Sequence, residues 1–286
     1  MNIAIRISGA LDAPNQFVEA KGRTLAYRSI GTGKPIVLCT RFRGTLDDWD
    51  PAFLDALAAN GLRVITFDYS GLGLSTGTPT YNPIEMVQDP RDLIEALELR
   101  DVVIGGWSIG GMAAQAMLAL HPRRLSHAVL IGTVPPGPNV KPAEQLFYDT
   151  AGLETYGIEE ETILFFEPRA QASREAARRS VARIAQRRSE RSVPVPIDFA
   201  RAKLGTDPKT PMFPAEPILE AMKRTAIPIL HVGGDHDIIF PVENWYALNQ
   251  TLPTLHLLTF PQAGHGPQHQ HPRLSADAIA SFIRNT

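Results

Sequence analysis

A serine framed by glycines, in the run GWSIG at 106–110, is the pattern with the clearest chemistry in this chain. The β-branched run VVI at 102–104 precedes it and predicts a buried parallel strand, and the unbranched apolar run at 112–120 predicts a buried helix. A strand that turns at once into a helix strains the turn residue, and glycines two positions away on each side leave room for that turn. The pattern predicts a nucleophile elbow that exposes the Ser108 hydroxyl. A glycine–serine turn without chemistry is the alternative.

A nucleophilic serine needs a general base, and the base needs an acid that orients it. After this kind of elbow the acid comes first along the chain and the histidine second. Two loops downstream fit, because residues 233–241 (GGDHDIIFP) and residues 260–267 (FPQAGHGP) each follow an apolar strand. The second loop offers His265 as the base, and the first offers Asp235 or Asp237 as the acid. Three further histidines are interpreted as loop or pocket-rim residues: His236, His269 and His271.

The elements that must position these loops alternate between strand and helix, which predicts a parallel sheet with helices on both faces. Residues 134–226 break the alternation, since they open with a proline-rich run and contain two helical stretches, at about 142–148 and 159–191. We therefore expect a core formed by residues 1–133 and 227–286. Residues 134–226 are expected to form a helical cap over the carboxyl ends of the strands, where open α/β sheets bind ligands.

Within the expected cap, residues 174–188 (REAARRSVARIAQRR) are rich in arginine. Charge runs of this kind are usually solvated helix faces, and Ala177, Val181 and Ile184 would form its narrow apolar stripe. An anion site for an acidic substrate is the alternative. The solvated helix is the preferred interpretation.

Composition excludes several classes of partner. The 286 residues carry a net charge of −2, which argues against nucleic acid and against a basic face for membranes. No apolar stretch is long enough to cross a bilayer. The single cysteine, Cys39, excludes an intrachain disulfide framework and fits a reducing compartment. The amino-terminal residues, in which Ile3, Ile5 and Ile7 suggest a short edge strand, lack the features of a signal peptide.

These observations predict a cytoplasmic protein with a small-molecule substrate. No metal or organic cofactor is expected, because the sequence contains neither a cluster of metal ligands nor a phosphate-binding loop. The oligomeric state is left open between a monomer and a homodimer.

The motifs together resemble the α/β-hydrolase fold superfamily, and within it the serine-dependent, capped hydrolases of esterase or lipase type. Residues 234–241 match the family's Gly-x-x-Asp-x-x-x-Pro pattern with Asp237 at the acid position, and the glycines around His265 match its histidine loop. Residues 68–75 (DYSGLGLS) resemble a further family loop, with Ser70 where arginine is usual. The resemblance covers the chain from Gln16 onward.

This resemblance implies an α/β fold with a mostly parallel sheet of about eight strands, flanked by helices, and a helical cap inserted after the sixth strand. It implies a catalytic triad of Ser108, Asp237 and His265.

The oxyanion loop is where the chain departs from the family. The family commonly carries His-Gly after the third strand, followed by the residue whose backbone N–H is one oxyanion donor, and Thr40 and Arg41 stand in place of that pair here. By this match the Phe42 N–H is one donor and the Ile109 N–H is the other. Backbone donors do not depend on the side chain, so the hole can survive the change.

Arg41, Arg43 and Trp107 are the predicted pocket residues. A cation at position 41 or 43 would favour a substrate that bears a carboxylate. The alternative, and the preferred interpretation, is a surface ion pair with Asp47 or Asp48.

The expected activity is hydrolysis of a small-molecule carboxylic ester, or of a related lactone or acyl bond, through an acyl-enzyme. Carbon–carbon bond hydrolases, perhydrolases and acyltransferases keep the same triad and are alternatives, because fold alone does not fix chemistry. A ligand-binding receptor or pseudoenzyme on the same scaffold is a second alternative, which Thr40 and Arg41 favour and the intact triad disfavours.

Overall fold

The computed structural model describes residues 9–204, 213 and 215–286. Its strands are β1 (Gln16–Ala20), β2 (Arg23–Ile30), β3 (Lys34–Cys39), β4 (Leu62–Phe67), β5 (Val102–Trp107), β6 (Leu125–Ile131), β7 (Ile229–Gly234) and β8 (Leu255–Phe260). They form one sheet in the order β1-β2-β4-β3-β5-β6-β7-β8. β2 is antiparallel to β1 and β4, and all other neighbours are parallel. The expected eight-stranded, mostly parallel sheet is confirmed. The edge strand suggested by Ile3, Ile5 and Ile7 lies outside the described residues.

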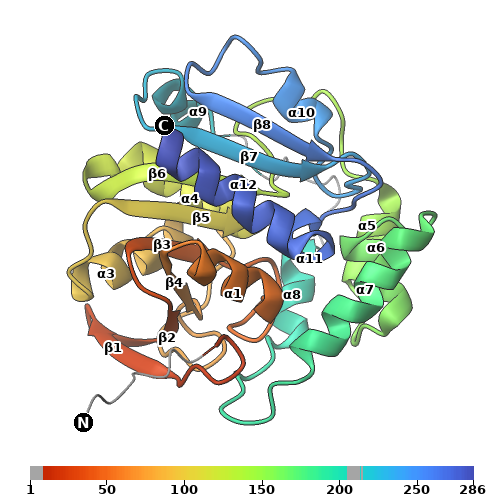
Figure 1. Cartoon of the computed structure of the whole chain (residues 1–286), viewed down its shortest axis with the longest axis horizontal. Coiled ribbons are helices and arrows are strands. Elements are labelled where there is room, and N and C mark those ends of the chain that lie inside the picture. Colours follow the sequence, from red (N-terminus) through yellow and green to blue (C-terminus); the bar gives the residue numbers. More distant parts are fainter. Residues whose placement is uncertain (1–8, 205–212, 214) are drawn as a thin grey trace.

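Helices cover both faces of the sheet (Figure 1). On one face, α1 (Pro51–Ala59) packs against α12 (Pro272–Asn285). On the other, α4 (Ile109–Leu120) packs against the central strands β3, β5 and β6, and α3 (Gln88–Ala96) packs against β3 and the edge strand β1. The shorter helices are α2 (Pro83–Met86), η1 (Pro122–Arg124), α10 (Glu243–Tyr246) and α11 (Pro267–Gln270).

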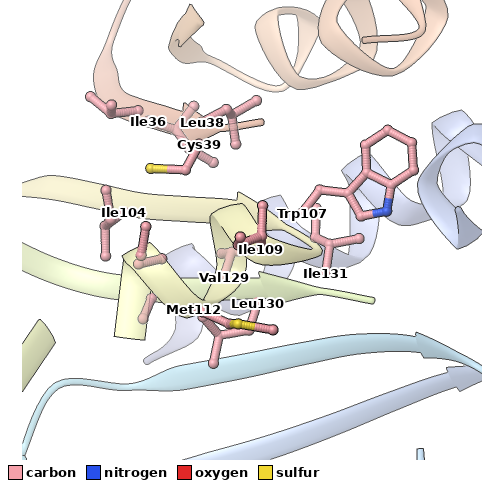
Figure 2. Packing of buried hydrophobic residues seen from close by; sticks show 14 of the residues in the cluster. Ile36, Leu38, Cys39, Ile104, Trp107, Ile109, Met112, Val129, Leu130 and Ile131 are labelled. Atoms are coloured by element: carbon pink, nitrogen blue, oxygen red, sulfur yellow. The ribbon is translucent and has the colours of Figure 1, made fainter. Parts of the chain in front are cut away.

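The side chains beneath the serine turn form the centre of the core (Figure 2). Ile36 and Leu38 of β3, Ile104 of β5 and Val129 of β6 are fully buried there. Strands that are covered on both faces need such continuous apolar runs, and each fully buried side chain of this size contributes about 1.5–3 kcal/mol. The end of β5, which leads into the serine, therefore lies in the fully buried core.

Four helices follow β6 and lie beyond the carboxyl ends of the strands, on the right of Figure 1. They are α5 (Gln145–Ala151), α6 (Ile158–Phe165), α7 (Gln171–Ile184) and α8 (Ile197–Leu204). The helical stretch expected at 159–191 is interrupted between α6 and α7, where Pro168 lacks a backbone donor. A fifth helix, α9 (Glu216–Met222), packs against α4 of the core although it falls within the predicted cap. We use the word cap for residues 145–204, which span α5 to α8, and the predicted boundaries of 134–226 stay a prediction.

Candidate active site

Ser108 occupies a strained turn between β5 and α4. Its φ of 62° and ψ of −127° lie in a region that non-glycine residues rarely adopt. Space for the turn comes from two glycines: a Cβ at Gly106 would lie 2.1 Å from the Gly110 oxygen, and one at Gly110 would lie 2.2 Å from the Cys39 oxygen. The pattern that singled out this serine in the sequence is thus a steric requirement of the turn.

Asp237 and His265 are brought together from the loops after β7 and β8. The His265 Nδ1 lies 2.8 Å from the Asp237 Oδ2, and each side chain is only 1% exposed. The other carboxylate oxygen of Asp237 accepts hydrogen bonds from the backbone N–H groups of Ile239 and Phe240, at 2.8 and 2.9 Å. The carboxylate is therefore fixed on both sides, and His265 is oriented by it.

Burial raises the pKa of Asp237, but the charge of His265 and the hydrogen bonds to the carboxylate more than offset this, so the pKa lies below its ordinary value. Asp237 is accordingly ionised at neutral pH. A carboxylate at Nδ1 holds the proton on that nitrogen and leaves Nε2 of His265 as the basic atom.

The competing acid, Asp235, does not contact His265. Its Oδ1 lies 2.6 Å from the Nδ1 of the neighbouring His236, in a half-exposed pair. The Nε2 of His269 accepts the Asp50 backbone N–H at 3.2 Å, and burial lowers the pKa of His269 to about 4. His271 stacks on Phe260. Of these four loop histidines, only His265 therefore pairs with Asp237, and the other three have different partners.

A cavity of about 100 Å³ is lined by both Ser108 and His265. Its wall is mainly apolar, with Phe147 and Leu164 from the cap and Ile239 from the loop after β7 among its residues. Phe42 and Ile109 also line it. Within the described residues no protein acceptor takes the backbone N–H of Phe42 or Ile109, so both amides are available to a substrate oxygen.

Arg41 lines this cavity as expected, but its charge is already paired with that of Asp48. One end of the guanidinium donates to the Phe42 carbonyl oxygen at 2.8 Å, and the other is 2.6 Å from Asp48. Asp48 in turn accepts the Thr45 backbone N–H at 2.7 Å. The expected ion pair is present, although it is buried rather than on the surface, since Arg41 is 6% exposed. Arg41 therefore braces the loop that carries the Phe42 amide.

The other two predicted pocket residues are not among the described residues that line this cavity. The indole N–H of Trp107 donates to the His265 carbonyl oxygen at 2.8 Å, so Trp107 supports the histidine loop from behind. Arg43 points into the cap, where its guanidinium donates to the carbonyl oxygens of Leu153 and Glu154 at 2.7 and 2.9 Å and lies 4.4 Å from the Tyr156 ring. Both residues position parts of the site.

Lys203 of α8 lines the cavity, and no sequence pattern singles it out. It belongs to a cap helix for which the family supplies no motif, so only the folded chain reveals its position.

Among residues 9–204, 213 and 215–286, no group of three His, Cys, Asp or Glu side chains could hold a metal ion. None of the helices in the described ranges is long and apolar enough to cross a membrane.

Comparisons with known proteins agree with this architecture. The family model described as alpha/beta hydrolase fold matches residues 34–272. A Mycobacterium tuberculosis protein that carries the provisional name non-heme bromoperoxidase BpoC is 27% identical over 266 residues, which cover 91% of this chain and 97% of that protein.

Two solved structures extend the comparison. An alpha/beta hydrolase fold protein from Chitinophaga pinensis superposes with a TM-score of 0.82 at 28% identity and covers 98% of this chain and 100% of its own. A thermophilic esterase from Thermogutta terrifontis gives a TM-score of 0.71 at 25% identity, with 95% and 98% of the two chains covered.

Proposed function

The chain belongs to the alpha/beta hydrolase fold family, and we propose that it is a serine hydrolase that cleaves a carboxylic ester, or a related acyl bond, of a small molecule. The observation that carries this proposal is the buried His265–Asp237 pair, whose histidine borders the same cavity as the strained Ser108. A nucleophile, a base and an orienting acid are the parts that acyl transfer needs.

In the proposed reaction the Nε2 of His265 takes the proton of the Ser108 hydroxyl, and the oxygen attacks the ester carbonyl carbon. The negative charge on the carbonyl oxygen is stabilised by the N–H groups of Phe42 and Ile109, and loss of one such donor typically costs about 3 kcal/mol of barrier. His265 then gives the proton to the departing alcohol. Water repeats the sequence on the acyl-enzyme and releases the acid.

A perhydrolase is the second candidate, because a relative that matches 91% of the chain carries the name of a bromoperoxidase. In that reaction hydrogen peroxide instead of water attacks the acyl-enzyme and releases a peracid. The same triad serves both reactions, so the acceptor decides between them. Acyl-enzyme partitioning between water and added peroxide, followed as acid and peracid, measures this choice.

Labelling with a fluorophosphonate, read by intact mass, tests the nucleophile without the natural substrate. We expect one adduct on the wild type, one on the exposed-serine control Ser189→Ala and none on Ser108→Ala. No adduct on any of the three would contradict an activated serine and favour a ligand-binding protein on this scaffold.

The acid is tested by a matched pair of substitutions two residues apart. Asp237→Asn is expected to lower kcat for a simple ester by about 10⁴-fold, because the imidazole loses its correct tautomer. Asp235→Asn is expected to change it by less than about threefold, since Asp235 contacts His236 instead. Equal losses would refute the assignment of Asp237.

A further inference from the structure

The cavity at Ser108 has an unusual balance of charge. Most of its wall is apolar, and its described lining residues include two cations, Arg41 and Lys203, but neither Asp nor Glu. An apolar cavity that is positively charged binds an apolar ligand with a negative end better than a neutral one. The question is which of the two cations can pair with the negative end of such a ligand.

Arg41 is not free. Its guanidinium is paired with Asp48, bonded to the Phe42 carbonyl oxygen and stacked 4.6 Å from the Phe165 ring. An anion that approached Arg41 would have to displace a short, buried ion pair, which is costly.

Lys203 forms no such contacts with the described residues. It lies one residue before the end of α8, and the described part of the chain gives its ammonium group neither an ion pair nor a hydrogen bond. Lys203 is an exposed residue, and the partial burial of its ammonium group lowers its pKa. An anionic group in the cavity could pair with this ammonium group without displacing another partner from the described part of the chain.

We propose that Lys203 binds a carboxylate of the substrate, so that the protein selects esters with an apolar body and a second, anionic carboxylate end. The proposal rests on the proposed function and adds the substrate class to it. The carboxylate can belong to the acyl part, as in a monoester of a dicarboxylic acid, or to the alcohol part, as in an ester of a hydroxy acid. Both place the same anion in the same cavity.

The experiment compares kcat/KM for monomethyl and dimethyl adipate, which share their body and differ in one carboxylate. We expect the wild type to prefer the monoester by at least about tenfold, and Lys203→Met to lower kcat/KM for the monoester about tenfold while changing the diester less than about threefold. The loss should fall on KM rather than kcat, because the contact exists before and during the reaction. Acetyl esters of 6-hydroxyhexanoate and of its methyl ester form the second arm and locate the carboxylate on the alcohol side.

Two variants serve as controls. Lys203→Arg keeps the charge and is expected to retain the preference. Lys223→Met removes a cation that pairs with Glu220 outside the cavity and is expected to change neither ester. Equal losses on both members of each pair in Lys203→Met, or a wild type without preference in either arm, would overturn the proposal.

A binding measurement separates this inference from the hydrolase proposal. Calorimetry with Ser108→Ala, which cannot turn over, is expected to show tighter binding of monomethyl than of dimethyl adipate, and Ser108→Ala/Lys203→Met is expected to lose the difference. Preferential binding without any hydrolysis by the wild type would support the carboxylate site and reject the hydrolase. Hydrolysis of the neutral esters without any preference would do the reverse.

Discussion

The cap is attached to the core in two different ways. On the α7 side, residues 171–192, the attachments are polar and buried. Arg183 binds the fully buried Asp50 through two nitrogens. Arg187 donates to the carbonyl oxygens of Leu11 and Ala13, at 3.0 and 2.9 Å.

On the cavity side, formed by α5, α6 and α8, the attachments are largely apolar. Phe147, Leu164 and Leu204 face the cavity, and Phe199 stacks on Tyr81 of the core with ring centroids 4.9 Å apart. Polar exceptions are Arg43, which binds carbonyl oxygens at the end of α5 and just after it, and the Gly266 N–H, which donates to the Phe165 carbonyl oxygen of α6 at 2.7 Å.

This difference indicates that the two sides of the cap have different roles. Ion pairs and fork-shaped guanidinium contacts fix one geometry, whereas apolar contacts tolerate small rearrangements. The first kind lies outside the lining of the cavity at Ser108, and the second forms part of that lining. The α7 side should therefore govern stability, and the cavity side should govern activity.

The largest effect is expected from a substitution that removes the ion pair between the α7 side and the core. Arg183→Met leaves the Asp50 carboxylate buried without its cation, and loss of one partner of a buried pair costs about 3 kcal/mol or more. We expect a loss of this size in the free energy of unfolding, measured by urea denaturation. The folded variant should keep its kcat/KM for a simple ester within about twofold, because Arg183 does not line the cavity.

A double variant identifies the cause. In Asp50→Asn/Arg183→Met the buried charge is gone while the residue that caps α1 can still accept the Ala52 N–H. The double variant should be more stable than Arg183→Met alone. If it is less stable, the contribution of Arg183 is packing rather than charge compensation.

The arginine-rich run shows where sequence reasoning ends. A solvated helix was the preferred interpretation, yet Arg183 and Arg187 of this run contact the core. Their partners in the core lie 133 or more residues away, and three of the contacts on Arg187 are backbone carbonyls, which leave no trace in a residue pattern. A charge run alone cannot reveal a partner that only the fold brings near.

The residues of the proposed triad, by contrast, can be predicted because each follows a strand end and has its own local pattern. The steric need for Gly106 and Gly110 marks Ser108, and the Gly-to-Pro spacing marks Asp237 over Asp235. The roles of Arg43 and Lys203 depend on how the cap folds, for which no such pattern exists.

The loop at 68–75 gives an intermediate case. Ser70 stands where the family usually has arginine, and Arg23 of β2 supplies a guanidinium there instead: its Nε lies 2.6 Å from the Ser70 hydroxyl and 3.1 Å from Asp89. The departure was visible in the sequence, but its compensation from another strand was not.

The second-largest effect is expected from a substitution that removes polar contacts on the cavity side. Arg43→Met removes the bonds to the carbonyl oxygens after α5 and the contact with Tyr156, next to the Phe42 amide. We expect kcat/KM to fall about tenfold, which is about 1.4 kcal/mol of barrier, with a loss of only about 1 kcal/mol in unfolding free energy. Ester kinetics and urea denaturation on the same preparation measure both.

Arg201→Met is the matched control, because Arg201 also donates to a carbonyl of this segment, that of Gly152 at 3.0 Å, but comes from within the cap. It should change kcat/KM by less than about twofold. If it has the same effect as Arg43→Met, the cap–core contact at Arg43 is not special. If Arg43→Met costs more stability than Arg183→Met, the division between the two sides is wrong.

A pH-dependent effect is expected at the end of the α7 side, where the Ser192 hydroxyl donates to Asp68. Burial raises the pKa of Asp68 to about 6, although hydrogen bonds from Ser192, Leu74 and Leu46 oppose this. The folded chain therefore binds a proton here more tightly than the unfolded chain, whose Asp has a pKa of about 3.9. The stability that this group contributes is fully present below about pH 4 and is lost as the pH rises through about 6.

Ser192→Ala removes a donor to the ionised form of Asp68, so it raises the folded pKa further and costs most where Asp68 is charged. We expect a loss of about 1.5 kcal/mol in unfolding free energy at pH 8 and less than half of that at pH 5, with Ser189→Ala unchanged at both. The loss in Arg43→Met should be the same at both pH values, because backbone carbonyls do not titrate. A Ser192→Ala loss that does not shrink at pH 5 would mean that Asp68 is still ionised at pH 5, and the α7 side would then lack this pH-sensitive contact.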